Sequence, residues 1–561
     1  MKAPDPRRNL ILVFLALVVG ACAEADPDTT SVGAAAPGDG SHAALVDFFG
    51  EWRSFERPAF DGEVPDYTTP SMERRASDLP EWMAQLGAFD IDDWSTAEQV
   101  DWHILRAEMN GLSFDHAVRR PWARDPAYYV TIYTARSDVP AHEGSEHHGS
   151  LDLWTFERPF SDGDRAFITD RIAAIPTLLD QARGNLASSN ARDLWMAGLR
   201  SFRGQSTDLR VFANEVGGED EPLDEAIAEA IVASDAFHDW LEAEAESKTG
   251  PSGVGKDNYT WYMRNVHLVP YSWEEQVTLM RRELARSHSS LRLEEHRNRG
   301  LPELQRIQTP AEFDQRLNAE VDEYLRFLNE EEIHSVFDWM DPALRAVNGE
   351  FTPADPGQIR NFFNEVNYRD PLVMRTHMHH WIELARPPVE GSSTLRRTPL
   401  LYNIWDARSE GLATGVEEMM MHAGLFDGRP RSRELVWIML AQRAARALSG
   451  LYLHGNEFEM EEAVEYAMTW TPRGWLPDGA LVRGEQHLYL RQPGYGTSYL
   501  SGKIQIEELL AERALQLEDD FTLSAFFDDF FVPGIIPTVL VRWEMTGERD
   551  PILDGPLGYP Q

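Results

Sequence analysis

Cysteine is nearly missing from this chain, since its 561 residues include one, Cys22. Disulfide bonds within the folded chain are therefore excluded, and its stability must come from packing. Long apolar runs are missing too: the run at residues 10–19 is about half of the roughly 20 residues that a membrane-spanning helix needs. The sequence therefore does not predict a bilayer-spanning segment.

Positive charge is also scarce, with 52 Lys and Arg against 93 Asp and Glu and a formal net charge of −41. So acidic a surface repels polyanions, which argues against nucleic acid and anionic lipid headgroups as partners. A negatively charged surface instead attracts cations, so it favours a cationic ligand or a metal ion without identifying one. The Gly-x-Ser-x-Gly signature of many serine hydrolases is absent as well, which argues against that class of enzyme.

The start of the chain has the three parts of a bacterial lipoprotein signal. Three positive residues precede the apolar core at residues 10–19, and the small residues Gly20 and Ala21 precede Cys22. This pattern predicts that residues 1–21 are removed and that Cys22 carries acyl chains such as palmitate, which anchor the protein to a membrane. We expect it in the cell envelope, facing the periplasm or the exterior. The alternative, a retained anchor helix, does not explain why the only cysteine follows Gly-Ala.

Residues 22–42 form a second segment, rich in Ala, Asp, Thr, Gly and Pro and without an aromatic residue. Such a composition cannot bury a core, so we predict a flexible tether. Residues 43–561 then form the folded domain. Their number favours either two lobes or one large helical assembly.

Helical patterns dominate the folded domain. Two capping boxes, Ser272 to Glu275 and Thr309 to Glu312, each open a long stretch of apolar residues at helical spacing. Further predicted helices cover residues 164–186, 223–246, 432–451 and 498–517. Strand-like runs are few, with residues 128–133 the best and 481–490 a possible second. The fold class is therefore mainly α, a large multi-helix assembly with few short strands.

Two apparent motifs have simpler interpretations. Residues 250–256 have the Gly and Lys spacing of a phosphate-binding loop, but Asp257 stands where the motif needs a hydroxyl, so we predict a loop that caps the next helix. Residues 142–148 hold three histidines and two glutamates, yet they lack the four-residue spacing of a helical zinc site. We predict a solvated loop there.

A third cluster is a stronger candidate for chemistry. Residues 375–383 hold three histidines and a glutamate in a predicted short helix, on which His377, His380 and Glu383 share one face. A later helical stretch places Glu410 and Glu417 seven residues apart, on a common face.

Two imidazoles from one helix and a carboxylate from another form a reasonable zinc site with an open fourth position. We predict His377, His380 and Glu410 as metal ligands, with His379 as the alternative imidazole. The other interpretation is that these histidines cap helices or form hydrogen bonds inside a helical core.

Four segments resemble a known family, the bacterial domain-of-unknown-function family 885, which comprises large α-helical proteins regarded as zinc-peptidase-like. Residues 252–264 resemble its Gly-x-Gly, Tyr, Leu-Arg segment, and residues 409–417 its Ser-Glu-Gly-Trp-Ala-Leu-Tyr-Ala-Glu helix. Residues 493–503 are similar to its Pro-Gly-Gln-Ala-x-Ser-Tyr-Lys-x-Gly segment, and residues 174–186 to one of its helices. The resemblance implies one zincin-like helical domain from about residue 43 to the end.

The chain departs from this family at the metal motif, His-Glu-x-x-Pro-Gly-His-His. When the final pair is aligned with residues 379–380, Val373 and Met374 stand where His-Glu should be. When His377 takes the first position instead, Met378 replaces the glutamate. A thioether cannot accept a proton near neutral pH, so the expected general base is missing.

Other groups would have to complete a catalytic site. Glu383 and Glu417 are the nearest candidate bases by helical spacing, and Tyr499, which the family segment keeps, could steady an oxyanion. Our leading hypothesis is a lipid-anchored, zinc-peptidase-like hydrolase of peptide or amide-like substrates. The alternative is a catalytically inactive pseudoenzyme that binds peptides or serves as a structural envelope protein. A solute-binding protein is a third hypothesis, which the lack of alternating strands and helices disfavours.

Overall fold

The computed structural model describes residues 37–137, 147–218, 220–355, 357–389 and 391–560. The predicted signal peptide, Cys22 and most of the predicted tether lie outside these residues. Helices account for 68% of the structure and strands for 2%, which confirms the predicted mainly α class. Among the described helices, none combines the length and the apolar character needed to cross a membrane.

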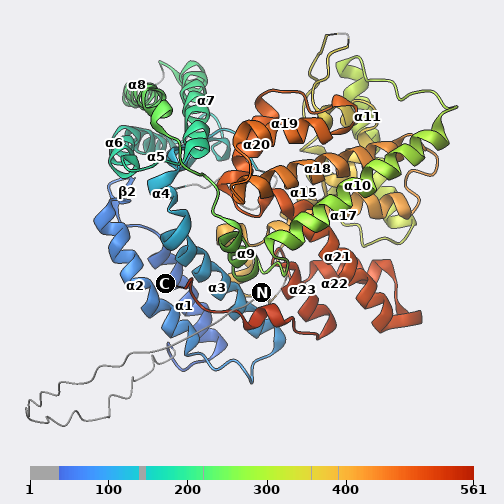
Figure 1. Cartoon of the computed structure of the whole chain (residues 1–561), viewed down its shortest axis with the longest axis horizontal. Helices are drawn as coiled ribbons and strands as arrows, with labels where there is room; N and C mark the ends of the chain where they lie inside the picture. Colours follow the sequence, from blue (N-terminus) through green and yellow to red (C-terminus); the bar gives the residue numbers. More distant parts are fainter. Residues whose placement is uncertain (1–36, 138–146, 219, 356, 390, 561) are drawn as a thin grey trace, which may run out of the picture.

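The first helices form the lower left part of Figure 1. They are α1 (His42–Glu56), α2 (Thr69–Gly87) and α3 (Thr96–Phe114), with a short antiparallel hairpin, β1 (Phe60–Asp61) and β2 (Val64–Pro65), between the first two. Ser41 caps α1 by accepting a hydrogen bond from the amide of Ala44. A π-helical turn, Asp115–Arg119, follows α3 directly.

A second group of helices has its own hydrophobic core, built from residues 67–241. Its members are α4 (Pro121–Arg124), α5 (Asp162–Ala173), α6 (Ile175–Leu186), α7 (Arg192–Val216) and α8 (Glu221–Glu244). The predicted helix at residues 164–186 is divided between α5 and α6, since Pro176 lies in the first turn of α6 and cannot continue a helix. The prediction for residues 223–246 is confirmed by α8.

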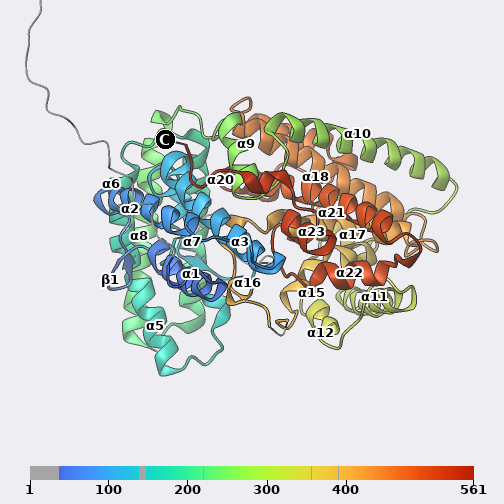
Figure 2. The ribbon, with the colours of Figure 1, turned by 90° about the horizontal axis from the view of Figure 1, so that it is seen from below.

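The larger core joins residues 45–114 to residues 254–553. Its long helices are α10 (Trp273–Asn298), α11 (Pro310–Glu330), α17 (Asp406–His422), α18 (Ser432–His454) and α21 (Tyr495–Leu517). The shorter ones are α9 (Lys256–Asn265), α12 (Met340–Arg345), α13 (Phe362–Asn367), α14 (Pro371–His377), α15 (His379–Leu384), α16 (Thr394–Arg397), α19 (Met460–Trp470), α20 (Ala480–Arg491), α22 (Leu523–Phe531) and α23 (Thr538–Thr546). The described residues therefore form two substantial cores, and the first and last parts of the chain share one of them. Figures 1 and 2 show α23 near α3, where these parts meet.

The end of the chain is fixed to α3. Arg106 donates hydrogen bonds to the carbonyls of Leu553 and Gly555, and Asn110 donates to that of Pro556. The C-terminus accordingly lies beside α1 and α2 in Figure 1. The N-terminal helices thus take part of their support from the last residues of the sequence.

Two strand predictions are wrong in whole or in part. Residues 128–133 form a 3-10 turn (Pro126–Tyr129) and the two-residue strand β3 (Ile132–Tyr133), which pairs in parallel with β4 (Leu151–Asp152). Residues 481–490 lie in the helix α20, because Val482, Gln486 and Tyr489 recur at helical spacing and are buried together.

Three helix starts were predicted from local sequence signals, and one of them, that of α11, is confirmed only in part. Ser272 and Glu275 form the predicted capping box of α10. Thr309 caps α11, but the carboxylate of Glu312 accepts from the amide of Gln308 instead of completing the box. The loop at residues 250–256 leads into α9 as predicted, with Gly255 at φ 88° just before the first helical residue.

The prediction of a solvated loop at residues 142–148 is wrong for its last two histidines. His147 is 1% exposed. His148 Nε2 lies 3.2 Å from Glu56 Oε2, and its amide donates to the hydroxyl of Tyr67. These partners lie about 80 to 90 residues earlier in the chain, so the local sequence gave no sign of them. His142, Glu143 and Glu146 lie outside the described residues.

Candidate metal centre

The predicted helix through residues 375–383 is interrupted. Helix α14 ends at His377, Met378 takes ψ 14°, and α15 begins at His379. The break still brings His377 and His380 together, with ring centroids 4.8 Å apart and planes at 73°. Glu410, from α17, completes a group whose possible ligand atoms all lie within 4.8 Å of one another. All three side chains are buried.

His377 is oriented by a second layer of charge. Its Nδ1 lies 2.9 Å from Glu417 Oε1, and Arg443 donates to both oxygens of Glu417, at 2.8 and 2.7 Å. Arg443 Nη2 also lies 3.0 Å from that Nδ1, but a guanidinium only donates, and it already serves the carboxylate. The imidazole proton therefore belongs on Nδ1, facing Glu417. This arrangement directs the lone pair of Nε2 away from Glu417, as in the carboxylate–histidine pairs that support metal ligands.

Burial holds both imidazoles in the neutral form. The pKa of His377 is lowered by burial and by Arg443, in spite of the opposite effect of Glu417. The pKa of His380 lies well below its usual range because of burial and the neighbouring His377. A metal ion binds the neutral imidazole, so these shifts suit a metal site.

Glu410 is positioned by a tyrosine that the sequence analysis did not select. Tyr495, in the first turn of α21, donates from its hydroxyl to Glu410 Oε1 at 2.9 Å. The predicted Tyr499 lies one turn further on, half-buried, with its ring edge-on to that of Tyr495 and Arg443 5.8 Å from its centre. Tyr495 therefore binds one of the predicted ligands directly.

Glycines allow α17 and α21 to approach closely at this point. A methyl group on Gly411 would lie 2.5 Å from Cα of Gly502, and one on Gly502 would lie 1.8 Å from the carbonyl oxygen of Ala407. Only glycine fits such a contact between backbones. Two segments about 90 residues apart in the sequence, each with a resemblance to family 885, therefore meet and place Tyr495 against Glu410.

Three other predicted residues lie away from the group or are held by arginines. His379 Nδ1 lies 2.9 Å from the hydroxyl of Tyr324, and its ring stacks on Phe531, so it is separate from the His377 and His380 pair. Glu383 accepts hydrogen bonds from Arg408 at 2.8 Å and Arg386 at 2.9 Å.

Glu417 is held in the same way, by Arg443. Burial alone would raise the pKa of Glu417, but Arg443 and His377 outweigh that effect and lower it. A carboxylate that is bound so tightly to a guanidinium is a poor proton acceptor, so these contacts disfavour Glu383 and Glu417 as bases.

The donor set fits a divalent transition metal. Two imidazole nitrogens and one carboxylate oxygen, buried and already oriented, are the ligand types that zinc prefers. Tyr495 and the Glu417–Arg443 pair fix the carboxylate and one imidazole, as metal sites generally require of their surroundings. The sequence could not reveal Arg443, which lies 66 residues beyond His377. Tyr495 stands four residues before the tyrosine that the family segment pointed to.

Two of the solved structures with a similar fold are from the bacteria Shewanella oneidensis and Colwellia psychrerythraea. A proposed lipoprotein of unknown function from Shewanella oneidensis matches with TM-score 0.66 and 14% identity, over 90% of this chain and 99% of that one. A proposed lipoprotein from Colwellia psychrerythraea matches with TM-score 0.61 and 13% identity, over 92% of this chain and 100% of that one. At such identities the likeness concerns the fold. No curated protein matches the sequence.

The fold and the buried group define a large all-α protein with a candidate metal centre between its long C-terminal helices. A family model matches residues 49–365 and 380–545, and the chain belongs to that family, the bacterial proteins of unknown function DUF885. The interruption between the matched parts, residues 366–379, contains His377, Met374 and Met378.

Proposed function

We propose that this protein is a lipid-anchored metallohydrolase of the cell envelope, which binds one zinc ion through His377, His380 and Glu410 and acts on peptide or amide-like substrates. The convergence of these three donors within 4.8 Å, backed by Glu417 and Tyr495, carries the proposal. The lipoprotein pattern around Cys22 supports export, and the solved structures from Shewanella oneidensis and Colwellia psychrerythraea are described as proposed lipoproteins.

The proposed site contains metal ligands, residues that position them and a proton acceptor. A zinc ion with three protein ligands would supply a Lewis acid with one open coordination position. His377 is held in one tautomer by Glu417, and Glu410 is held by Tyr495. Asp406 precedes Glu410 by one helical turn on α17 and is fully buried, so we propose it as the proton acceptor.

One set of observations favours a second candidate, an inactive pseudoenzyme that keeps the metal. His380 and Glu410 are each 1% exposed, so a substrate reaches them only if the surrounding helices open. The two bases predicted from spacing are both bound by arginines. In this alternative the metal would hold α14, α15 and α17 together without turnover.

Metal analysis of adjacent histidine variants tests the site. Mature protein from zinc-supplemented cells should contain about one zinc ion per chain, and His380→Ala should lose it because one of three ligands is removed. His379→Ala is the matched control: His379 is the preceding residue and equally buried, but it contacts Tyr324 and Phe531, so the zinc content of this variant should stay unchanged. A metal-free wild type, or equal losses in the two variants, would refute the site.

Hydrolysis assays then separate the two candidates. A peptide and amide library should be cleaved by the zinc-loaded protein and not after chelation. Asp406→Asn should lower turnover by about 10²–10⁴-fold with the zinc retained, as removal of a general base does. A zinc-loaded wild type that cleaves no member of the library would decide for the pseudoenzyme.

A further inference from the structure

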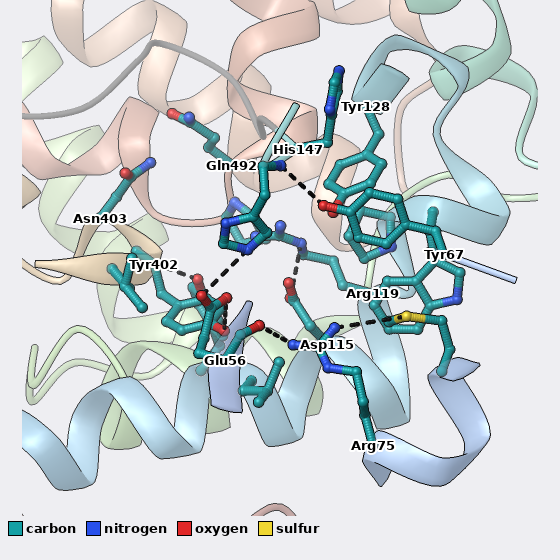
Figure 3. Close-up of a pocket in the computed structure, with 18 of the residues that line it drawn as sticks. Glu56, Tyr67, Arg75, Asp115, Arg119, Tyr128, His147, Tyr402, Asn403 and Gln492 are labelled. Carbon is teal, nitrogen blue, oxygen red and sulfur yellow. Dashed lines mark hydrogen bonds and ion pairs between the residues drawn. The ribbon is translucent and has the colours of Figure 1, made fainter. Parts of the chain in front are cut away.

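A second polar site lies apart from the metal centre. A cavity of about 320 Å³ opens between the N-terminal helices and the segments that precede α17 and α21, and no residue of the metal group lines it. Figure 3 shows two carboxylates, Glu56 and Asp115, and two guanidiniums, Arg75 and Arg119, around this space. The cavity thus gathers charges of both signs in equal number.

Glu56, the last residue of α1, forms one side of the cavity. Tyr402 donates to its Oε1 at 3.3 Å, and His148 Nε2 lies 3.2 Å from its Oε2. Burial alone would raise the pKa of Glu56, but His148 and then Arg75 and Arg53 outweigh it and lower the pKa. Glu56 therefore remains a carboxylate and can attract a cationic group.

Asp115 and Arg119 form the opposite charges of one π-helical turn, with Arg119 Nε 3.1 Å from Asp115 Oδ1. The turn ends at Arg120, which adopts a left-handed conformation at φ 41°. π-helical turns within α-helices are rare and are found mainly at functional sites. The planar guanidinium of Arg119 suits a carboxylate ligand.

Backbone strain occurs at the same cavity. Tyr402 and Asn403 both adopt the left-handed region, at φ 58° and 54°. Residues other than glycine rarely adopt the left-handed region, because it is strained for them. Strained residues of this kind cluster at functional sites. The ring of Tyr402 is fixed in place against Gly111, where a methyl group would lie 2.3 Å from the ring.

The buried charges, the π-helical turn and the two left-handed residues at this cavity do not favour the stability of the fold. Buried ion pairs contribute little net stability because desolvation offsets their attraction. The cavity is large enough for a small organic ligand, at the lower end of the range of about 300–1,000 Å³ for ligand pockets. A simple anion would face Glu56 and Asp115, and a simple cation would face Arg75 and Arg119. A ligand with one charge of each sign matches the walls best.

We propose that this cavity binds a small zwitterion, a free amino acid or a dipeptide, with its ammonium group at Glu56 and its carboxylate at Arg119. Tyr67, Tyr128 and Tyr262 line the same space and add ring faces that attract an ammonium group. The site is independent of the metal centre, and its occupancy does not require hydrolysis.

Calorimetry on the mature wild-type protein, with zinc and after chelation, tests the proposal. The ligands are the free amino acids and a panel of Gly-X dipeptides, followed by the N-acetylated and C-amidated forms of the best binder. We expect zwitterions to bind in both metal states, and each blocked form to bind at least about tenfold more weakly, which corresponds to about 1.4 kcal/mol. The proposal fails if no zwitterion binds, or if a blocked form binds as tightly as the parent.

Variants then assign the two ends of the ligand. Glu56→Gln should weaken the zwitterion at least about tenfold while changing the affinity of the N-acetylated form much less, since that form has no ammonium group. Glu215→Gln, in the exposed pair with Arg158, is the matched control and should bind like wild type. Equal weakening of both ligands by Glu56→Gln in a folded protein would refute the assigned orientation. If Glu56→Gln does not fold, the blocked ligands on wild type still decide.

Discussion

The candidate metal centre and the proposed zwitterion cavity both contain buried charged groups, but these groups are arranged differently in the two sites. In the metal centre, Glu417 is clamped by Arg443 and Glu410 by Tyr495, and the three candidate ligands are packed within 4.8 Å of one another. In the cavity, the charged groups stand around about 320 Å³ of space. The first arrangement suits an ion, and the second suits a molecule.

The contrast shows that burial of a charged group does not by itself indicate the kind of ligand. Glu417 and Asp115 are both buried carboxylates that face an arginine, yet their pKa values move in opposite directions. Arg443 lowers that of Glu417 in spite of burial, whereas burial raises that of Asp115 to about 6 in spite of Arg119. At Glu417, His377 adds to the effect of Arg443, whereas at Asp115 the neighbouring carboxylate Glu56 adds to the effect of burial.

The largest effect is expected at the clamped carboxylate. Glu417→Gln leaves Arg443 buried without a charged partner, which typically costs about 3–5 kcal/mol of stability. It should also weaken zinc binding by about 10–100-fold through the loss of orientation at His377. Urea denaturation and metal titration measure the two effects. Glu215→Gln, which breaks an exposed pair with Arg158, should cost about 0–1 kcal/mol and leave zinc binding unchanged.

A smaller effect, with a characteristic pH dependence, is expected at Asp115. Its pKa is raised from 3.8 to about 6 by burial, so the folded state binds its proton more tightly than the unfolded state does. The stability that this proton provides is present below pH 4 and is lost as the pH rises through 6. Asp115→Asn removes this dependence, so the free energy of unfolding of the variant relative to wild type should increase by about 3 kcal/mol between pH 4 and pH 7.

The same measurement on Glu417→Gln should give the opposite sign. Because the pKa of Glu417 is lowered in the folded state, the charged carboxylate stabilises the fold at pH values above its usual pKa of 4.5. This stabilisation is lost as the pH falls, so the difference in unfolding free energy between wild type and Glu417→Gln should shrink toward pH 4. Parallel pH profiles for the two variants would contradict the contrast between the two sites.

The smallest effect is expected at the contact between α17 and α21. Gly411→Ala places a methyl group 2.5 Å from Gly502, and such overpacking typically costs about 1–3 kcal/mol. Because the helices must separate, Tyr495 should move from Glu410, and zinc affinity should fall while zwitterion binding persists. Gly415→Ala, one turn later, meets nothing closer than 3.7 Å, so it should be neutral or stabilise the helix by up to about 1 kcal/mol. Calorimetric unfolding and zinc titration compare the pair.

The sequence predicted the fold class and several long helices because their signals are local. Apolar spacing located α8, α18 and α21, and the Ser272 capping box located the start of α10. The strand prediction for residues 481–490 is wrong because the buried face of α20 includes the polar residues Gln486 and His487, which an apolar pattern does not mark.

The candidate site was predictable only where spacing along a helix sufficed. His377 and His380 lie three residues apart and remain together, but the break at Met378 turns His379 toward Tyr324. Arg443, which disfavours Glu417 as a base, comes from another helix. The zwitterion cavity had no signature at all, because its walls come from α1, a π-helical turn and two helix-preceding loops.

The shared core of the first and last segments bears on how the chain reaches its folded state. Helices α1 and α3 belong to the core that includes Leu553, and Arg106 and Asn110 are bonded to residues 553–556. During synthesis these helices have no complete partner until the ribosome has reached the end of the message. Contacts of such long sequence separation form late and slowly. The N-terminal helices therefore complete their core only after the last residues of the sequence have been made, and Glu56 and Asp115 belong to segments that depend on this late contact.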